Sequence, residues 1–363
     1  MATRWNAGET GHAEWRAMVL NRDMDSINRR VVLRAHPQGL VRDDDLAIEQ
    51  GPVPQPDEGQ LLVRNHWLSV DPMIRIFIDA APLGGSVPPM PIGTTVPGPA
   101  VGQVIRSNRP DFAVGDWVEG RLGWQDYALS SGQGLNRIDP DDGPVELALG
   151  MLGLPGFSAF VGLDVAGPLA QGTILLVSGA AGAVGSAVGA LARARGLHAI
   201  GIASGPGKCA WLRKTGYADA VDRTAPDFAE QLARAVGDRV DLYFDNVGGP
   251  MMDSVLPLMK RGGQVLICGL MAQYDDMVGR EGGGHDRLPA FLAAVMARGL
   301  IVKAFANIDH LALRPAFLAE MGAIIRADPA IARVHVTQGM EQVPAAFRRL
   351  FTDSVVGKSL VRI

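Results

Sequence analysis

The segment from Gly179 to Gly185, GAAGAVG, has a glycine at every third position. It lies between an apolar run (173–178, TILLVS) and a small-residue helical stretch (186–195, SAVGALARAR). This strand–turn–helix context is the one in which a Gly-rich turn binds a pyrophosphate at a helix N-terminus. Gly179 permits the tight turn, Gly182 lets the backbone approach the anion, and Gly185 lets the helix pack closely. We therefore predict a dinucleotide-binding turn; a packing turn without a ligand is the alternative.

From about residue 153 onward, apolar runs alternate with helical stretches. Fully apolar strands separated by helices are typical of a parallel sheet that is covered on both faces. We therefore predict an α/β fold with a doubly wound, Rossmann-type parallel sheet. The runs lie at residues 173–178, 198–203, 219–221, 240–245, 264–269 and 301–305, with helix-like segments at 228–236 and 251–260.

The first 145 residues have a different texture, rich in Pro and Gly, with short β-branched runs at 60–70 and 98–107. Short strands broken by turn residues predict a mostly-β, barrel-like unit. The last thirty residues or so return to strand-like ends and are expected to rejoin that first unit. The predicted organisation is a first domain at 1–145 with an N-terminal extension at 1–27, a nucleotide-binding domain at 146–318, and a return to the first domain at 319–363.

Charge and cysteine usage exclude several classes of binding partner. Lys+Arg 34 against Asp+Glu 38 gives a net charge of −4, which offers no electrostatic basis for binding nucleic acid or an anionic membrane. No apolar run reaches the roughly 18 residues that a spanning helix needs. The two cysteines, Cys209 and Cys268, read as small buried hydrophobes, because two cysteines cannot build a disulfide framework. We expect a cytoplasmic protein that acts on a small molecule.

The end of the second apolar run of the nucleotide-binding domain indicates which dinucleotide binds. About 20 residues after the glycines, an Asp or Glu would bind the ribose diol of NAD. Here the segment 200–212 has Ser204 and no carboxylate, Lys208 follows, and Arg223 comes one run later. Cations in place of the acid favour a 2′-phosphate, so NADP(H) is the expected cofactor. Solvated surface positions are the alternative for Lys208 and Arg223.

Five segments together resemble a known family. The chain is similar to the zinc-independent medium-chain dehydrogenases/reductases, in the branch of leukotriene B4 12-hydroxydehydrogenase, prostaglandin reductase and the alkenal or curcumin double-bond reductases. The resemblance covers most of residues 30–360 and implies a GroES-like mostly-β catalytic domain, a Rossmann domain and a homodimer. The segments, in the family's order, are VDPMIR (70–75), GLPGFSAFVGL (153–163), VSGAAGAVGS (177–186), FDNVGGPMMDSVLP (244–257) and CGLMAQY (268–274).

The resemblance also assigns site residues. The family's 2′-phosphate lysine falls on Lys208 and its catalytic tyrosine on Tyr274, whereas Arg223 stands where the family usually has tyrosine. Asn246 is expected near the cofactor, with a simple turn as the alternative. The full set expected to contact the cofactor is Gly179, Gly182, Ala183, Val184, Gly185, Ser204, Lys208, Arg223, Asn246, Cys268, Gly269, Tyr274 and Phe305.

Two positions depart from the family pattern. Met73 replaces the tyrosine of the family's VDPYMR motif, which removes a hydroxyl from the expected substrate pocket. Val355 replaces the asparagine of Asn-x-Gly-Lys, which removes an amide expected near the nicotinamide. Arg75, in the same motif as Met73, could bind a substrate carboxylate or phosphate, or form a structural salt bridge. Both replacements bear on the substrate range rather than on the hydride donor.

A zinc-dependent alcohol dehydrogenase is the first alternative, and the residues argue against it. Catalytic zinc needs Cys and His ligands. The first 145 residues contain no cysteine, and their histidines, His12, His36 and His66, have no metal-ligand spacing. The His285/Asp286 pair lies in a Gly-rich loop and is read as part of a turn. We predict no metal site.

Without a metal, a nicotinamide hydride can still add to the β-carbon of an α,β-unsaturated carbonyl, and charge then develops on the carbonyl oxygen. The site must supply a hydrogen-bond donor for that oxygen and a proton for the α-carbon. The prediction is NADPH-dependent reduction of enals or enones, with Tyr274 as the enolate-stabilising donor. A loop aromatic that only packs is the alternative for Tyr274. An NADPH:quinone oxidoreductase is the alternative, and a non-catalytic NADPH-binding protein is a further one.

Two other tyrosines and the loop after Tyr274 complete the predictions. Tyr243 lies in an apolar run and is read as core, and Tyr217 is read as part of a surface turn at a helix end. The loop contains three consecutive glycines, Gly282–Gly284, and residues 275–288 are predicted to form a mobile lid over the substrate.

Overall fold

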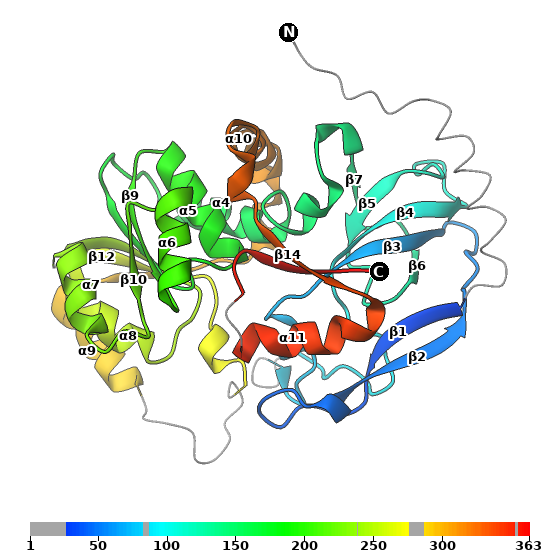
Figure 1. Ribbon diagram of the computed structural model, residues 1–363, viewed down its shortest axis with the longest axis horizontal. Coiled ribbons are helices and arrows are strands. Elements are labelled where there is room, and N and C mark those ends of the chain that lie inside the picture. The colour runs from blue at the N-terminus through cyan, green and yellow to red at the C-terminus, as the bar shows by residue number, and fades with distance from the viewer. Residues whose placement is uncertain (1–26, 83–86, 238, 276–286, 353–354) are drawn as a thin grey trace, which may run out of the picture.

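The computed structural model describes residues 27–82, 87–237, 239–275, 287–352 and 355–363. Two units lie side by side, and each is built on its own β-sheet (Figure 1). One sheet has six strands and the other seven, and a separate two-stranded hairpin packs with the second unit. The α/β fold class with a separate mostly-β unit is confirmed; the domain boundaries 1–145, 146–318 and 319–363 stay a prediction.

The six-stranded sheet is parallel throughout, in the order β10-β9-β8-β11-β12-β13. From β8 the chain adds β9 and β10 on one side. It then returns and places β11 on the other side of β8. This reversal is the topological switch point at which doubly wound sheets bind ligands. The strands are β8 (Ile174–Val177), β9 (His198–Ala203), β10 (Asp219–Asp222), β11 (Val240–Asp245), β12 (Met259–Ile267) and β13 (Ile301–Ala304).

Helices cover both faces of this sheet. Successive residues of β8 alternate between two apolar clusters, with Leu175 and Val177 in one and Leu176 in the other, because side chains in a strand point to opposite faces. The first cluster includes buried residues of α4 (Leu154–Ala166), α5 (Ala183–Ala194), α6 (Pro206–Thr215) and α10 (Arg314–Ala327). The second includes residues of α7 (Phe228–Val236), α8 (Met251–Val255) and α9 (Leu288–Arg298).

One helix is shorter than the sequence predicts. The expected helix at 251–260 is wrong beyond Val255, where α8 ends. Pro257 lies in the 3-10 turn that follows, and β12 begins at Met259. Proline cannot donate the hydrogen bond that a continuing helix requires.

The seven-stranded sheet belongs to the mostly-β unit. Six strands follow the order β14-β15-β3-β4-β5-β7, and β6 pairs with β3. The two C-terminal strands therefore extend a sheet that begins near the N-terminus (Figure 1). The elements are β1 (Ile27–Leu33), β2 (Leu46–Pro52), β3 (Leu61–Ser69), α2 (Ile74–Phe77), β4 (Ala100–Ser107), β5 (Trp117–Gly120), β6 (Tyr127–Ser130), β7 (Asn136–Ile138), β14 (Val334–Gln338), α11 (Val343–Thr352) and β15 (Lys358–Arg362).

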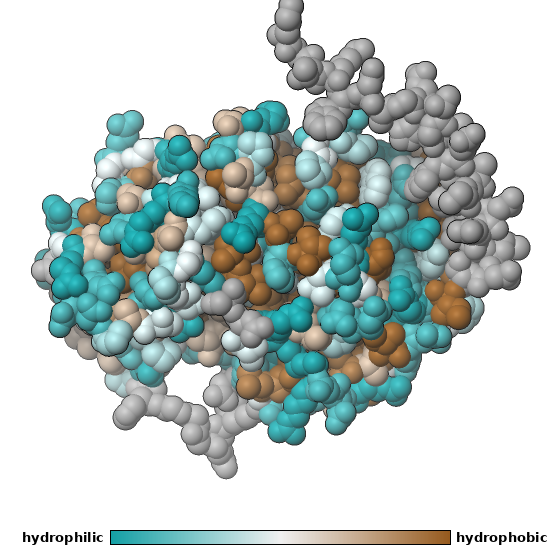
Figure 2. Space-filling view, viewed as in Figure 1, coloured by the Kyte–Doolittle hydropathy of each residue, from teal (hydrophilic) through white to brown (hydrophobic). Residues whose placement is uncertain are grey.

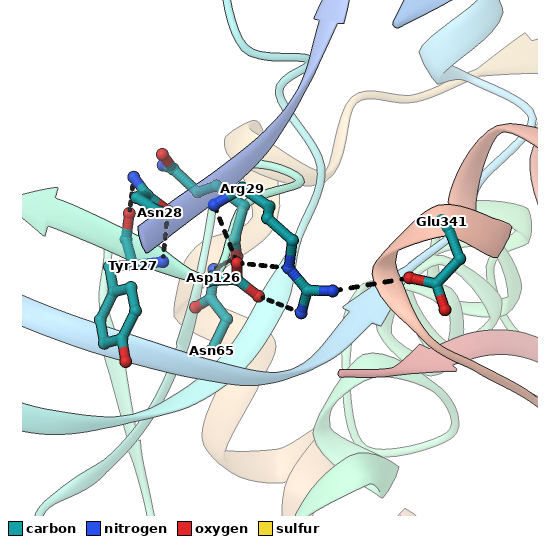
Figure 3. A network of polar contacts seen from close by, with 7 residues as sticks. Asn28, Arg29, Asn65, Asp126, Tyr127 and Glu341 are labelled. Atoms are coloured by element: carbon teal, nitrogen blue, oxygen red, sulfur yellow. Dashed lines mark hydrogen bonds and ion pairs between the residues drawn. The ribbon is translucent and has the colours of Figure 1, made fainter. Parts of the chain in front are cut away.

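A polar network fastens the N-terminal hairpin to this unit (Figure 3). The Arg29 guanidinium donates two hydrogen bonds of 2.9 Å to the Asp126 carboxylate, and the Arg29 backbone N–H adds a third of 2.8 Å. Arg29 also reaches Glu341, at 3.5 Å, just before α11. Beside this pair, Asn28 exchanges two hydrogen bonds with the Tyr127 backbone. The network joins β1 to segments from the middle and the end of the chain.

Candidate active site

The glycine turn connects β8 to α5 at the switch point of the sheet. Gly179 has φ +57°, a left-handed conformation that favours glycine. A Cβ on Gly185 would lie 2.5 Å from both Ala180 Cα and Gly179 O, so only glycine lets the helix start this close to the turn. Gly182 is the N-cap of α5, and Ala183 and Val184 form its half-buried first turn. Backbone N–H groups of a first helical turn lack intrahelical partners, and they fit an anion.

Asn246 follows β11 and is bound directly to the start of this turn. Its backbone N–H donates to Ser178 Oγ and its side-chain amide donates to Ser178 O, both at 2.8 Å. The ideal Cβ position of Gly179 lies 3.6 Å from the Asn246 Cβ. The structure therefore brings Asn246 and the glycine turn together at the ends of the two central strands.

Asp245 organises the same edge, and the sequence analysis gave it no role of its own. Its side chain is fully buried, and it accepts hydrogen bonds from Ser178 Oγ at 2.6 Å and Tyr243 Oη at 2.9 Å. It also accepts bonds of 3.0 Å from the N–H groups of Val247 and Gly248. A buried carboxylate held by several donors fixes the loops around it. The signal available in the sequence was an Asp that directly follows the apolar residues 242–244 at the end of β11.

Tyr274 lies in the loop after β12, next to the Asp245–Asn246 edge. The backbone N–H groups of Cys268 and Gly269 both donate to Asp245 O, at 2.8 and 3.1 Å. The Tyr274 hydroxyl accepts a hydrogen bond of 3.3 Å from the Leu270 N–H and lies 3.3 Å from the ideal Cβ position of Gly269. Burial is the main cause that raises the Tyr274 pKa, so the hydroxyl keeps its proton in the neutral range.

Lys208 and Arg223 lie near each other beyond β9 and β10. Lys208 is on α6 and half-buried, and its pKa is lowered mainly by burial and further by the Arg223 charge. Arg223 is exposed, and its N–H donates to Ala203 O at 2.8 Å, which fixes it beside the end of β9 and close to Ser204. Two cations held together fit a dianionic phosphate, whose charge would compensate both.

The segment that carries Met73 is tied to both parts of this edge. At one end, Lys358 donates to Asp71 Oδ1 at 2.5 Å, and the neighbouring Gly357 N–H donates to Ala181 O of the glycine turn at 2.8 Å. At the other end, Arg75 pairs with Asp275, the residue after Tyr274, at 3.0 Å. Met73 lies between these two contacts and is 39% exposed.

Arg75 itself is fully buried. Its guanidinium donates to Asp79, to Asp275 and to Gly39 O. This is the structural salt bridge that the sequence analysis left open as one of two roles.

The remaining predicted residues lie as follows. Phe305 comes just after β13, two strands away from β11, and is half-buried against the cluster that contains α4. The prediction that Tyr217 lies at the surface is wrong: it is 4% exposed, and its hydroxyl donates to Gly185 O at 2.6 Å. Its ring fills the space that a glycine at position 189 leaves on α5. Tyr243 is fully buried, as predicted for a core residue.

Most of the predicted lid lies outside the described residues, since 276–286 are not among them. His285 and Asp286 lie in the same range. Within the part of the chain that the structure describes, no three His, Cys, Asp or Glu side chains come together as a metal site. The described helices also include none with the length and apolarity needed to cross a membrane.

Comparison with known proteins identifies the family. Residues 29–138 match the N-terminal domain of oxidoreductases, and residues 183–282 match a family described as zinc-binding dehydrogenase. The chain is 36% identical to the NADPH-dependent curcumin reductase of Escherichia coli over 93% of this chain and 97% of that protein. It belongs to the zinc-independent medium-chain reductases.

Two further members of this reductase family place the chain more closely. An NADP(+)-dependent 2-alkenal reductase of Nicotiana tabacum is 30% identical over 93% of this chain and 97% of that protein. The crystal structure of CurA from Vibrio vulnificus in complex with NADPH superimposes with a TM-score of 0.85 and 36% identity, covering 92% of this chain and 98% of that one. The chain is thus an oxidoreductase of the branch that contains the curcumin and alkenal reductases.

Proposed function

We propose that this protein uses NADPH to reduce the C=C bond of α,β-unsaturated carbonyl compounds, enals and enones. The observation that carries the proposal is the position of the Tyr274 hydroxyl, in the loop after β12 and beside the edge formed by Asn246 and the glycine turn. The reductase names of the relatives, which act on curcumin and alkenals, support the same chemistry.

The residues present fit the cofactor. The turn from Gly179 to Gly185 would hold the pyrophosphate, and Lys208 with Arg223 would hold the 2′-phosphate. Asn246, Cys268 and Gly269 line the edge along which the rest of the dinucleotide would extend. Bound NADPH supplies a hydride for the β-carbon of the substrate.

The chain's own contribution to the reaction is a hydrogen-bond donor for developing negative charge. As the β-carbon is reduced, charge moves to the carbonyl oxygen, and the Tyr274 hydroxyl would donate to it. A raised pKa suits this role, because the hydroxyl stays a donor across neutral pH. Protonation of the α-carbon then completes reduction of the double bond.

The position of Met73 indicates an apolar region in the substrate pocket. Met73 is 39% exposed on a segment held between the glycine turn and the Tyr274 loop. A flexible apolar side chain accommodates flat or irregular apolar ligands. This same observation favours quinone reduction as a second candidate function.

The decisive experiment follows the loss of NADPH absorbance, with NADH in parallel, against a 2-alkenal, an aryl enone, a quinone and a saturated aldehyde. We expect turnover of the alkenal or enone and none of the saturated aldehyde. Turnover of the quinone alone would support the second candidate. NADPH binding without turnover of any of the four would support a non-catalytic role.

We also propose that the protein is a homodimer formed through the edge strand β13. On α9, Leu288, Leu292 and Met296 recur every fourth residue and are 59, 54 and 83% exposed, so they form one apolar face. Ile301 and Val302 on β13 are also exposed, at 49 and 39%. Large exposed apolar patches mark interaction surfaces. Light scattering should give the dimer mass for the wild type and a smaller mass for Met296→Glu.

A cytoplasmic location is part of the proposal. Both cysteines, Cys209 and Cys268, are free thiols, as is usual in a reducing compartment.

A further inference from the structure

Arg75 is a fully buried cation that joins the two units of the molecule. It lies on α2 of the mostly-β unit, and its Nε donates at 3.0 Å to Asp275 Oδ1, in the loop that follows β12 of the parallel sheet. Arginine is rarely buried unless its charge is paired. The Arg75–Asp275 contact is therefore a fixed point between α2 and this loop.

The rest of the Arg75 guanidinium is held inside its own unit. Nη1 donates to Asp79 Oδ2 at 2.7 Å, one helical turn away, and Nη2 donates to Gly39 O at 3.1 Å. Removal of Asp275 would leave Arg75 paired with Asp79, so the buried charge stays compensated. The contact across the two units can thus be broken without removing the ion pair within one of them.

Asp275 directly follows Tyr274 in the chain. The Tyr274 ring folds back so that its hydroxyl meets the Leu270 N–H, and Asp275 on the other side is drawn toward Arg75. The contact of the Tyr274 hydroxyl and the ion pair of the next residue together restrict the Tyr274 backbone. Reacting groups must be held within about 1 Å of the productive position, since a larger error reduces rates about 100-fold.

We propose that Asp275 is a positioning residue, which sets the place of the Tyr274 hydroxyl through its ion pair with Arg75. In this role the pair does not contact substrate; it fixes the Tyr274 loop relative to α2, whose N-cap is Met73. This inference rests on the proposed function, in which Tyr274 donates to the substrate oxygen.

Asp275→Ala tests the proposal, because it breaks the contact with Arg75 across the units. We expect kcat for an enone to fall about tenfold, with the NADPH Kd from fluorescence within about twofold and an unchanged melting temperature. Asp275→Asn keeps an oxygen that can accept the Arg75 Nε–H bond, and it should recover most of kcat. A fall in melting temperature that accounts for the lost activity would overturn the proposal.

Glu320→Ala is the matched control. Glu320 and Arg195 form an ion pair of 2.9 Å with side chains 33 and 29% exposed, similar to the 27% of Asp275. Both partners lie within the unit of the parallel sheet, away from Tyr274. This variant should leave kcat unchanged. An equal fall of kcat in Asp275→Ala and Glu320→Ala would overturn a specific role for Asp275.

A double-mutant cycle with Tyr274→Phe separates the two proposals. If Asp275 acts through the Tyr274 hydroxyl, Asp275→Ala should add less than about twofold to the loss in Tyr274→Phe. If the two losses of kcat are fully additive, or if Tyr274→Phe is slow while Asp275→Ala keeps the wild-type kcat, the positioning role alone is overturned. An unaffected Tyr274→Phe would overturn the role of Tyr274 and the positioning role with it.

Discussion

The backbone N–H of Gly357 donates a hydrogen bond of 2.8 Å to the carbonyl of Ala181, in the middle of the glycine turn. A parallel bridge between Gly182 and Gly357 accompanies it. The residue after Gly357 is Lys358, which begins β15 and pairs with Asp71. The last strand of the mostly-β unit therefore begins against the proposed cofactor site. In the space-filling view, hydrophobic residues gather near the middle of the face, over the region between the two units (Figure 2).

Gly357→Ala should weaken both stability and NADPH binding. Gly357 has φ +79°, and a Cβ there would lie 2.1 Å from Arg333 O, so the backbone must move. We expect a loss of about 2–4 kcal/mol in the free energy of unfolding and a higher Kd for NADPH. Gly172→Ala is the control, since Gly172 has φ +76° with open space around it. Equal effects in urea unfolding would contradict the role of the contact with Ala181.

Lys208→Ala should change cofactor preference. The half-buried ammonium is close to Arg223, and we expect its loss to remove a charge-assisted bond worth about 1.5–3 kcal/mol. The KM for NADPH should rise about 10- to 100-fold, and the KM for NADH should stay nearly constant. Lys214→Ala, an exposed lysine on the same helix, is the control in steady-state kinetics. A parallel rise for both cofactors would contradict a 2′-phosphate site.

Tyr274→Phe should lower kcat about 100-fold, the usual effect of removing one donor to a developing oxyanion. The NADPH Kd should change little. Because the Tyr274 pKa is raised above its ordinary value of 10, the wild-type hydroxyl keeps its proton and kcat should not decline through loss of this proton below about pH 10. A basic limb in the kcat profile at neutral pH that disappears in Tyr274→Phe would contradict this assignment.

His66 should make the fold sensitive to acid. Burial lowers its pKa to about 4, with smaller effects of Arg64 and Arg362, and its ring packs on Trp117 at 4.9 Å. His66 takes up a proton near pH 6.5 in the unfolded chain but only near pH 4 in the native state. The stability that depends on neutral His66 is therefore complete above pH 6.5 and is lost as the pH falls toward 4. The loss reaches about 3 kcal/mol. His66→Phe should unfold with a flatter pH dependence than the wild type in urea titrations at pH 7 and 4.5.

Gly189→Ala should destabilise the nucleotide-binding unit. A Cβ at Gly189 would lie 2.3 Å from the Tyr217 ring, and overpacking of this kind costs about 1–3 kcal/mol. Gly207→Ala is the matched control, because Gly207 is also helical and has nothing within 4 Å. That variant should be neutral or slightly more stable, as expected for Ala in a helix. Equal melting temperatures for the two variants would contradict this packing.

Local patterns in the sequence are sufficient to predict the secondary-structure elements around the site. The glycine spacing between an apolar run and a helix predicts β8, the turn and α5, and the alternating runs predict the parallel sheet. Since parallel strands end at a common edge, residues after successive strands gather there, as Asn246 and the Tyr274 loop do beside the turn. The missing acid after β9 points to NADP from sequence alone.

The sequence by itself determined the fold class, the switch point and the side chains available at it, because these depend on periodicity and on residues close together in the chain. Only the tertiary structure decided that Tyr217 is buried against α5, that Asp245 holds the loops after β8 and β11, and that Arg75 pairs with Asp275. Such contacts join residues that are distant in sequence. Their partners are selected by how the helices and sheets pack, for which no local pattern exists.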